Sequence, residues 1–411
     1  MAVLVSGTAT SAVVARALGP SGRGTLAVAF AMTLMLVQFG SFGLATANPY
    51  YAARDSRAVA QIVANSLWLA LMLGAALTAV GFGVKAWFPS VVEGLGWAEL
   101  AVALLGVMPA LAGLFLQSIL LGEGRMLAYN AVELAQAVLT LVALVLGFWI
   151  FDLGVLGALA VMVAGLFGSA FGYLGVLRQY LPRLPRADPR LVKEMLRYGF
   201  RIYIATLLAF LVIRLDILLV NSFLGAAEAG LYSLVAALGE GMVLLPTVIA
   251  VNLFPRVARS GGHDLSAHVF RATALLFGAA CLMSIPLAGP AIRLVFGPDF
   301  APATELYYWL LPGLFSLGML TILSHHFAGR GFPLEAMVIW FVGLGVNLAI
   351  NFAFLAEGGT WVASLASTVA YSLLLVLHVR LFSRESGGYL ALLPRFSDVL
   401  NLARLVRPRS S

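Results

Sequence analysis

Residues 129–177 read YNAVELAQAVLTLVALVLGFWIFDLGVLGALAVMVAGLFGSAFGYLGVL, and this stretch decides the kind of fold. It holds two long apolar runs, near 129–150 and 154–177, in which Glu133 is the only charged residue. A helix needs about 20 consecutive apolar residues to cross a bilayer, and Asp152 and Gly154 lie at the break between the two runs. The stretch therefore predicts two antiparallel membrane-spanning helices.

The same pattern recurs along the whole chain. Of its 411 residues 62% are hydrophobic and 10% are charged, whereas soluble domains carry roughly 25% charged residues. We therefore predict an all-α integral membrane protein of about 12 transmembrane helices. The other expected helices lie near 2–18, 26–50, 62–88, 98–121, 199–221, 230–254, 270–296, 304–328, 334–355 and 360–382. The first run has no basic lead-in, so we expect a membrane helix and not a cleaved signal peptide, which leaves open a native start upstream of Met1.

Basic residues in the loops predict the orientation of the helices. The net charge of +7 would favour nucleic acid as a partner of a soluble protein, but these charges lie between apolar runs. With both termini in the cytoplasm, most of the 25 Lys and Arg residues fall on the inner side. Only four fall on the outer side, namely Arg16, Arg23, Lys85 and Arg293, while Arg214 lies within a span.

Two basic segments lie outside the spans, at 178–198 and 383–411. In the first, Asp188 suits a helix N-cap and Pro189 the first turn, so we expect an amphipathic helix over 188–198 on the inner membrane surface. Its partners there are membrane lipids with anionic headgroups, or the segment is a plain linker. The last segment is a cytoplasmic tail. The single cysteine, Cys281, lies in an apolar run and is expected to be a packing residue.

Short glycine patterns recur at a nearly constant offset and indicate an internal repeat. Gly19 and Gly24 match Gly225 and Gly230 with an offset of 206, and Gly122-Glu123-Gly124 matches Gly329-Arg330-Gly331 with an offset of 207. Because six helices return the chain to the same side, the copies form a parallel repeat. We predict pseudo-symmetric lobes at 1–177 and 199–382 around a central cleft that works by alternating access. A repeat kept only for packing is the alternative.

Several motifs resemble those of a known family. They are Ala15-Arg16-Ala17-Leu18-Gly19-Pro20 with Gly22-Arg23-Gly24, Tyr198-Gly199, Arg214-Leu215-Asp216, Gly230-Leu231-Tyr232-Ser233, Phe254-Pro255-Arg256, Phe296-Gly297 with Phe300, and Asn347 with Ala363-Ser364-Leu365-Ala366-Ser367. They are similar to the oligosaccharide and polysaccharide flippases of the superfamily that includes multidrug extruders and lipid II flippases. Trp361 and Val362 depart from the family pattern, which usually has Gly before the Ala-Ser stretch.

The resemblance implies a transporter of the bacterial cytoplasmic (inner) membrane. Such a protein moves an oligosaccharide linked to polyprenyl diphosphate from the inner to the outer leaflet for cell-surface polysaccharide assembly. Its partners would be this lipid-linked substrate, membrane lipids and possible polysaccharide assembly proteins, with no nucleic acid and no cofactor. We expect no enzymatic activity.

Five charged residues are candidates for the substrate-binding cleft, because charges inside spans are costly and arginine binds phosphate bidentately. Arg214 and Glu240 lie about 10 and 15 Å from the outer ends of their helices at 1.5 Å per residue. Arg214 and Asp216 point about 200° apart, so we expect one of them to meet Glu240. Arg16 could contact the diphosphate on the outer side and Arg54 on the inner side. The alternative for the Arg214–Glu240 region is a structural ion pair. The alternative for Arg54 is an anchor at the inner membrane surface.

Three further residues are candidates for gating or ion coupling. Glu133 either lines the cleft or caps a loop, and His325 and His326 either titrate near neutrality or form a hydrated pair at the interface. There is no Walker motif and no His/Cys cluster that would hold a metal. The energy would therefore come from a gradient of H⁺ or Na⁺, or from consumption of the product outside.

Two other functions compete with the flippase. A drug or cation antiporter of the same superfamily would favour carboxylates in the cleft, and three arginines against two carboxylates lean toward an anionic substrate. A membrane glycosyltransferase or polysaccharide polymerase would carry a large outer loop, whereas every expected outer loop has only about ten residues or fewer. A structural partner in a synthase complex would leave the repeat unexplained.

Overall fold

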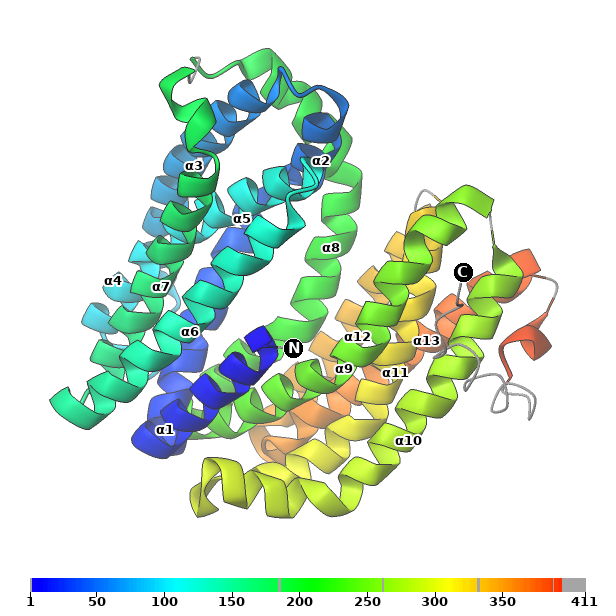
Figure 1. Cartoon of the computed structure of the whole chain (residues 1–411). Coiled ribbons are helices and arrows are strands. Elements are labelled where there is room, and N and C mark those ends of the chain that lie inside the picture. Colours follow the sequence, from blue (N-terminus) through cyan, green and yellow to red (C-terminus); the bar gives the residue numbers. More distant parts are fainter. Residues whose placement is uncertain (1, 184–185, 261, 331–332, 387, 394–411) are drawn as a thin grey trace. The chain divides into compact units, whose positions relative to one another are not determined.

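The computed structural model describes residues 2–183, 186–260, 262–330, 333–386 and 388–393. Every regular element in these ranges is helical. The chain forms two compact units, a first unit, Met1–Ser233, and a second unit, Leu234–Ser411. The elements, shown in Figure 1, are α1 (Ala2–Ser41), α2 (Leu44–Arg54), α3 (Val59–Trp87), η1 (Pro89–Val92), α4 (Trp97–Leu105), α5 (Val107–Gly122), α6 (Met126–Phe151), α7 (Val155–Val176), η2 (Arg178–Arg183), α8 (Pro189–Leu224), α9 (Ala226–Ser260), α10 (His263–Phe296), η3 (Pro298–Phe300), α11 (Ala303–Gly329), α12 (Leu334–Gly358), α13 (Trp361–Ser386) and η4 (Tyr389–Leu392).

The number of membrane helices agrees with the expected number once α1 is divided. Eleven helices of the described residues are long and apolar enough to cross a membrane, and α1 contributes one of them, Val5–Ser41. Gly19 interrupts α1 with φ 65° and ψ −174°, a conformation that favours glycine, so the element is two helices. This division makes twelve. Arg23, just beyond the break, donates through Nη1 to the carbonyl (3.1 Å) and the hydroxyl (2.8 Å) of Ser11, just before it.

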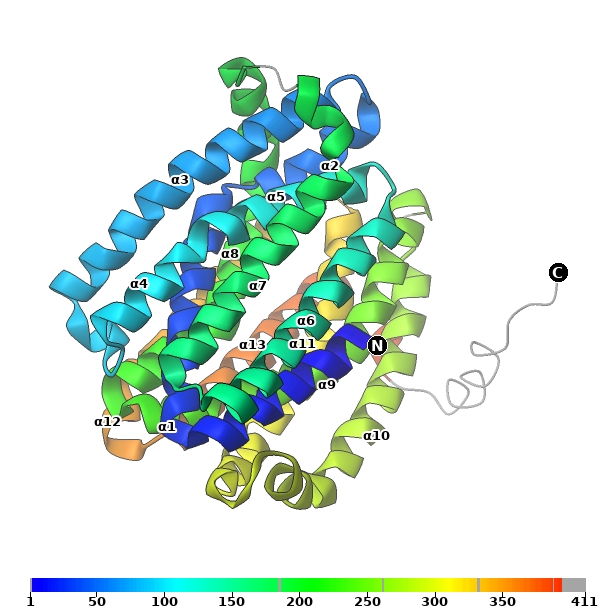
Figure 2. The same ribbon diagram turned by 60° about the vertical axis from the view of Figure 1, so that its left-hand side comes forward.

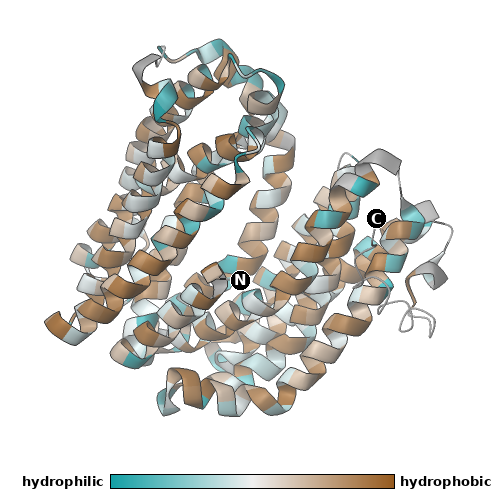
Figure 3. Cartoon of the chain, viewed as in Figure 1, coloured by the Kyte–Doolittle hydropathy of each residue, from teal (hydrophilic) through white to brown (hydrophobic). Residues whose placement is uncertain are grey.

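The surface of the helices is that of a protein in lipid. Large apolar side chains lie exposed along α6 and α10, including Leu127 at 87% and Trp149 at 83%. Figure 3 shows hydrophobic residues along the length of the helices, with hydrophilic residues more frequent toward their ends. In water such exposure would favour aggregation, whereas in a bilayer it matches the hydrocarbon. The integral membrane class is therefore confirmed.

The predicted helix near 26–50 is broken at Phe42 and Gly43. Both residues have positive φ, 42° and 84°, and α2 begins only at Leu44. The break lies where the chain packs against α8: a Cβ on Gly43 would lie 2.6 Å from the Gly199 carbonyl, and a Cβ on Gly199 would lie 2.2 Å from the Gly43 oxygen. This backbone-to-backbone contact brings α2 and α8 together.

The predicted amphipathic helix at 188–198 is present, but it continues without a break into the next span as α8. Asp188 caps it by accepting hydrogen bonds from the backbone N–H of Arg190 (2.9 Å) and Leu191 (3.4 Å). The backbone N–H of Asp188 donates in turn to Asn65 Oδ1 of α3 at 2.8 Å. The predicted boundary between 198 and 199 is therefore absent, and Gly199 lies inside α8 at a point of close packing with Gly43.

The glycine repeat has a counterpart in the packing of the first unit. Gly225, like Gly19, combines a positive φ of 88° with an extended ψ of 176°. A Cβ on Gly24 would lie 1.6 Å from the carbonyl oxygen of Ala226, and a Cβ on Gly230 would lie 1.9 Å from that of Pro20. Pro20 and Ala226 are 206 residues apart, as are Gly24 and Gly230, so the contact exchanges equivalent residues, as a twofold axis would.

A second pair of contacts follows a similar offset, 207 for the glycines and 205 for their partners, with one contact within each unit. In the first unit a Cβ on Gly122, at the end of α5, would lie 2.6 Å from the carbonyl oxygen of Pro49 in α2. In the second unit a Cβ on Gly329, at the end of α11, would lie 3.3 Å from that of Phe254 in α9. The predicted lobe boundaries at 177 and 199 differ from the division at Ser233 because α8 packs on α1 and α2, and they stay a prediction.

Within the first unit, α6 and α7 run side by side, as both Figure 1 and Figure 2 show. Within the second unit, α11 is the most enclosed span and packs against α10 and α13. Phe327 of α11 and Phe382 of α13 are fully buried in the apolar core there. These packed helices provide the rigid elements on which the candidate residues lie.

Candidate functional site

Arg54 ends α2 beside a cluster of aromatic rings. Its Nη1 donates to the Tyr50 hydroxyl at 3.0 Å. The Tyr50 ring stacks on Tyr198 of α8, with centroids 4.3 Å apart and planes at 19°, and Tyr51 stands edge-on to both rings. Arg54, Tyr50 and Tyr198 are exposed. The glycine contact at Gly43 between α2 and α8 brings these rings together.

This Arg54 cluster combines two kinds of recognition chemistry. A guanidinium binds phosphate oxygens, and exposed aromatic faces pack against apolar surfaces or hold a cation. Burial and the neighbouring tyrosines raise the pKa of Tyr198, so its hydroxyl stays neutral and remains a hydrogen-bond donor. The cluster is therefore suited to an anionic group that lies next to an apolar surface.

Asp216 is fully buried in α8, within a predicted membrane span. Its Oδ2 accepts a hydrogen bond of 2.9 Å from the hydroxyl of Tyr232 on α9. Arg214, two residues earlier, is half-buried, in keeping with side chains that point to different sides of the helix. A carboxylate in such surroundings is costly unless hydrogen bonds stabilise it, so the tyrosine is part of what allows Asp216 to lie there.

The other cleft candidates lie at exposed positions. Arg16 is exposed on the first half of α1, three residues before the break at Gly19. Glu240 is exposed on α9 in the second unit. The pairing of Arg214 or Asp216 with Glu240 stays a prediction.

Glu133 lies in a polar cluster that joins three helices of the first unit. The hydroxyl of Tyr173 (α7) donates to Glu133 Oε1 (α6) and also lies 3.4 Å from Oε1 of Gln117 (α5). Tyr129 stacks parallel to Tyr173 at 6.4 Å. Next to this cluster, α6 and α7 border a mostly apolar groove of 360 Å³, where Gln136 donates to Thr140 at 3.3 Å. Glu133 therefore has a defined acid–hydroxyl contact between spans.

The two histidines have different surroundings. His325 is half-buried, and its Nδ1–H donates to the carbonyl of Thr321 at 2.9 Å. His326 is fully buried, with Nδ1 2.7 Å from the Ser266 hydroxyl and its ring 5.0 Å from that of His263. His263 accepts a hydrogen bond from Arg330. The alternative of a hydrated interfacial pair is therefore wrong for His326, which packs into the core of the second unit.

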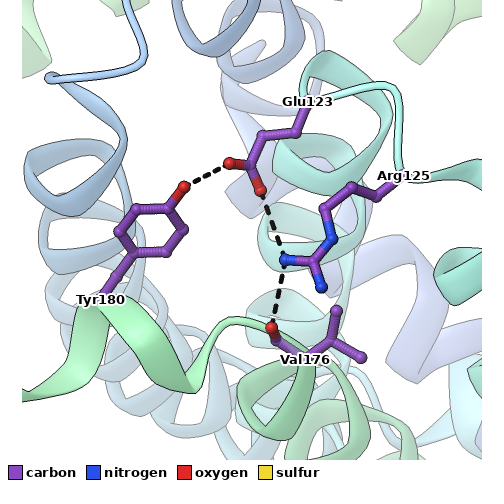
Figure 4. A network of polar contacts seen from close by, with 4 residues as sticks. All are labelled: Glu123, Arg125, Val176 and Tyr180. Carbon is purple, nitrogen blue, oxygen red and sulfur yellow. Dashed lines mark hydrogen bonds and ion pairs between the residues drawn. The ribbon is translucent and has the colours of Figure 1, made fainter.

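Figure 4 shows a further network at the loop between α5 and α6. Tyr180 donates to Glu123 Oε1, and Arg125 lies 3.9 Å from Glu123 Oε2 while donating to the Val176 carbonyl at 3.2 Å. Burial, together with the hydrogen bond to Glu123, raises the pKa of Tyr180. The network fastens the ends of α5, α6 and α7 to one another and has a structural role.

Sequence reasoning identified the charged residues but missed their tyrosine partners. Tyr232, Tyr173 and Tyr198 each complete a cluster around a candidate or beside it. Tyrosine is common in membrane proteins at interfaces, so its type alone carries little information. The useful signal would have been the position of each tyrosine one or two residues from a glycine, since Gly230, Gly172 and Gly199 allow close helix approach.

The comparisons with known proteins agree with this architecture. The chain is 27% identical over 345 residues to the succinoglycan biosynthesis transport protein ExoT of Rhizobium meliloti (strain 1021), a match covering 76% of this chain and 63% of that protein. The chain thus spans less than two thirds of the length of this relative.

Solved structures show the same fold at low sequence identity. An inward closed conformation of the lipid II flippase MurJ superposes with a TM-score of 0.76 at 13% identity, covering 98% of this chain and 88% of that one. An inward-facing multidrug resistance MATE family transporter of the MOP superfamily gives 0.72 at 16% identity, covering 100% and 96%. The chain therefore has the fold of MOP-superfamily transporters.

The family model described as polysaccharide biosynthesis protein matches residues 5–260, more than half of the chain and most of its candidate residues. With the helical repeat and the charged clusters described above, the chain belongs to the polysaccharide biosynthesis protein family.

Proposed function

We propose that the protein is a flippase that moves an oligosaccharide linked to polyprenyl diphosphate from the inner to the outer leaflet, for cell-surface polysaccharide biosynthesis. Membership of the polysaccharide biosynthesis family, with a relative named as a succinoglycan biosynthesis transport protein, is the observation that carries this proposal. The protein would lie in the cytoplasmic membrane of a bacterium with both termini inside, as the distribution of basic residues favours. It would act by alternating access between two six-helix lobes.

The physical problem is the transfer of a diphosphate and several sugars across about 30 Å of hydrocarbon. The polyprenyl chain can stay in the lipid, so only the polar head needs a path. Arg54, exposed beside Tyr50 and Tyr198, offers a cationic group and aromatic faces for the head at the predicted inner side. Arg16 and Arg214 would serve the outer side and the interior of the path.

Coupling to an ion gradient would use protonatable groups between spans. Glu133 with Tyr173, and His326 with Ser266, are hydrogen-bonded pairs that change when a proton or a Na⁺ ion binds. His325 lies next to the second pair in sequence. Polysaccharide assembly proteins that receive the sugar outside are the expected partners.

The test is flipping of a fluorescent polyprenyl diphosphate oligosaccharide in proteoliposomes, followed by quenching from outside. The wild type is compared with Arg54→Gln, Arg16→Gln and Arg214→Gln, and with Arg178→Gln as the control for an exposed arginine outside the spans. We expect flipping by the wild type and the control, and loss of at least about tenfold in the Arg54 variant, since a charge-assisted phosphate contact is lost. Wild-type protein that flips no such lipid would contradict the proposal.

A drug or cation antiporter is the second candidate function. The buried carboxylate Asp216 in a membrane span favours it, since a carboxylate binds a cation and not a phosphate. In the same proteoliposomes, proton-driven uptake of an organic cation that Asp216→Asn abolishes would identify this activity.

A further inference from the structure

The second unit has a groove of 520 Å³ between α12 and α13 at the ends of both helices. This volume lies in the range of sites that hold small ligands, about 300–1,000 Å³. Leu334 begins one predicted span and Arg384 ends the other, so the groove lies where a span reaches the headgroup region of a bilayer. None of the candidate transport residues lines it.

The groove ends where the two helices come into close contact. The Trp340 ring on α12 packs edge-on against His378 on α13, with centroids 6.1 Å apart. Further along, a Cβ on Gly343 would lie 2.6 Å from the side chain of Leu374, which marks a tight helix contact. The groove thus opens toward the ends of the helices and is closed toward the middle of the spans.

The α13 wall carries two arginines and two leucines on one helical face. Leu377, Arg380, Leu381 and Arg384 follow the i, i+3, i+4, i+7 pattern, so their side chains are neighbours. Both arginines are exposed and lie one turn apart. A phosphate placed between two such guanidinium groups can accept hydrogen bonds from both.

The α12 wall supplies Val338, which is 59% exposed, and the carboxylate of Glu335. Among the residues that the structure describes, Glu335 lies within 4 Å of neither Arg380 nor Arg384. The acid therefore leaves both guanidinium groups available for another anion. The three side chains together carry a net charge of +1.

We propose that this groove binds one anionic phospholipid of the phosphatidylglycerol type. Its phosphate lies between Arg380 and Arg384, and an acyl chain runs along Leu377, Leu381 and Val338 toward the Trp340–His378 contact. The glycerol hydroxyls of its headgroup donate to Glu335. A lipid of net charge −1 complements the charge of the groove, whereas phosphatidylethanolamine is neutral overall. Basic pockets between spans commonly bind anionic headgroups in this way.

The test measures lipid binding directly and needs no substrate. Purified protein in detergent is titrated with phosphatidylglycerol or phosphatidylethanolamine, and the lipid-bound fraction is read by native mass spectrometry. We expect Arg380→Gln/Arg384→Gln to weaken binding of phosphatidylglycerol on the order of tenfold, because each basic side chain near the membrane surface adds attraction. Arg178→Gln/Arg186→Gln removes the same charge from two exposed arginines elsewhere and should leave binding unchanged.

Two further variants separate the parts of the site. Val338→Trp fills the groove without changing charge and should displace the lipid. Because Val338 is exposed, the variant should fold like the wild type, which a thermal melt checks. Glu335→Gln should leave phosphatidylglycerol binding equal or stronger, since it removes a repulsion from the phosphate. Equal loss in both double variants, or preferential binding of phosphatidylethanolamine that Glu335→Gln abolishes, would overturn the proposal. Binding of polyprenyl phosphate in preference to phosphatidylglycerol would do so too.

Discussion

The contact between Gly24 and Gly230 allows a quantitative prediction for Gly24→Ala. The added Cβ would lie 1.6 Å from the carbonyl oxygen of Ala226, whereas ordinary contacts begin near 3.4 Å. The backbones would have to separate by close to 2 Å, because the three nearest atoms, from Ala226 and Gly230, are all backbone atoms that cannot rotate away. Overpacking of a tight site typically costs 1–3 kcal/mol, so we expect a loss at the upper end, about 3 kcal/mol.

The measurement is the thermal unfolding midpoint in detergent micelles, where about 3 kcal/mol should lower the Tm of a chain of 411 residues by roughly 3–4 °C. Gly175→Ala is the matched control, because this helical glycine has no atom within 4 Å of its built Cβ. That change should be neutral, or stabilising by up to about 1 kcal/mol, through the better helix propensity of alanine.

The equivalence of Gly24 and Gly230 adds a second prediction. Gly230→Ala should cost about as much as Gly24→Ala, because its Cβ would lie 1.9 Å from the Pro20 oxygen. The double variant should cost clearly less than the sum, since one separation of the helices relieves both clashes. A Gly24→Ala protein that melts with the wild type, or fully additive losses, would refute the reasoning.

Three other changes test single hydrogen bonds. Tyr232→Phe removes a donor from the buried carboxylate of Asp216 and should cost about 1–3 kcal/mol in a thermal melt. Ser266→Ala removes the hydrogen-bond partner of the buried His326 ring and should lower the free energy of unfolding by about 1 kcal/mol. An unchanged free energy of unfolding would contradict this contact. Tyr180→Phe should speed hydrogen exchange in the α5–α6 loop at neutral pH. Because the pKa of Tyr180 is raised, its contact with Glu123 is fully present at neutral pH and is lost only as the pH rises through that raised value. At alkaline pH the wild type should therefore lose protection from exchange in this loop, and the variant should show no such further loss.

The sequence predicted the spans well because apolar runs of about 20 residues have one solution in a membrane. It also located the N-cap at Asp188, which depends only on local chemistry. It did not show that the helix predicted over 188–198 and the span predicted from 199 form one helix, α8. Gly199 lies inside that helix, and its close packing depends on a partner that is distant in the sequence, Gly43.

The candidate residues were predictable only in part. Charges inside spans are visible in the sequence, and Asp216 and Glu133 were found in this way. Their partners come from other helices, Tyr232 from α9 and Tyr173 from α7, and no periodicity encodes which residue faces which across a helix contact. The buried state of His326 depends likewise on packing around α11.

The two copies of the repeat carry opposite charges at one equivalent position. Glu123 in the first copy and Arg330 in the second are 207 residues apart. Glu123 contacts Tyr180 and Arg125, whereas Arg330 donates a hydrogen bond to His263. Contacts made through glycine backbone leave such side chains outside the helix interfaces. In a parallel repeat equivalent positions lie on the same side of the membrane, so a duplicated scaffold built in this way can keep its geometry symmetric while the two halves acquire different charges on one face.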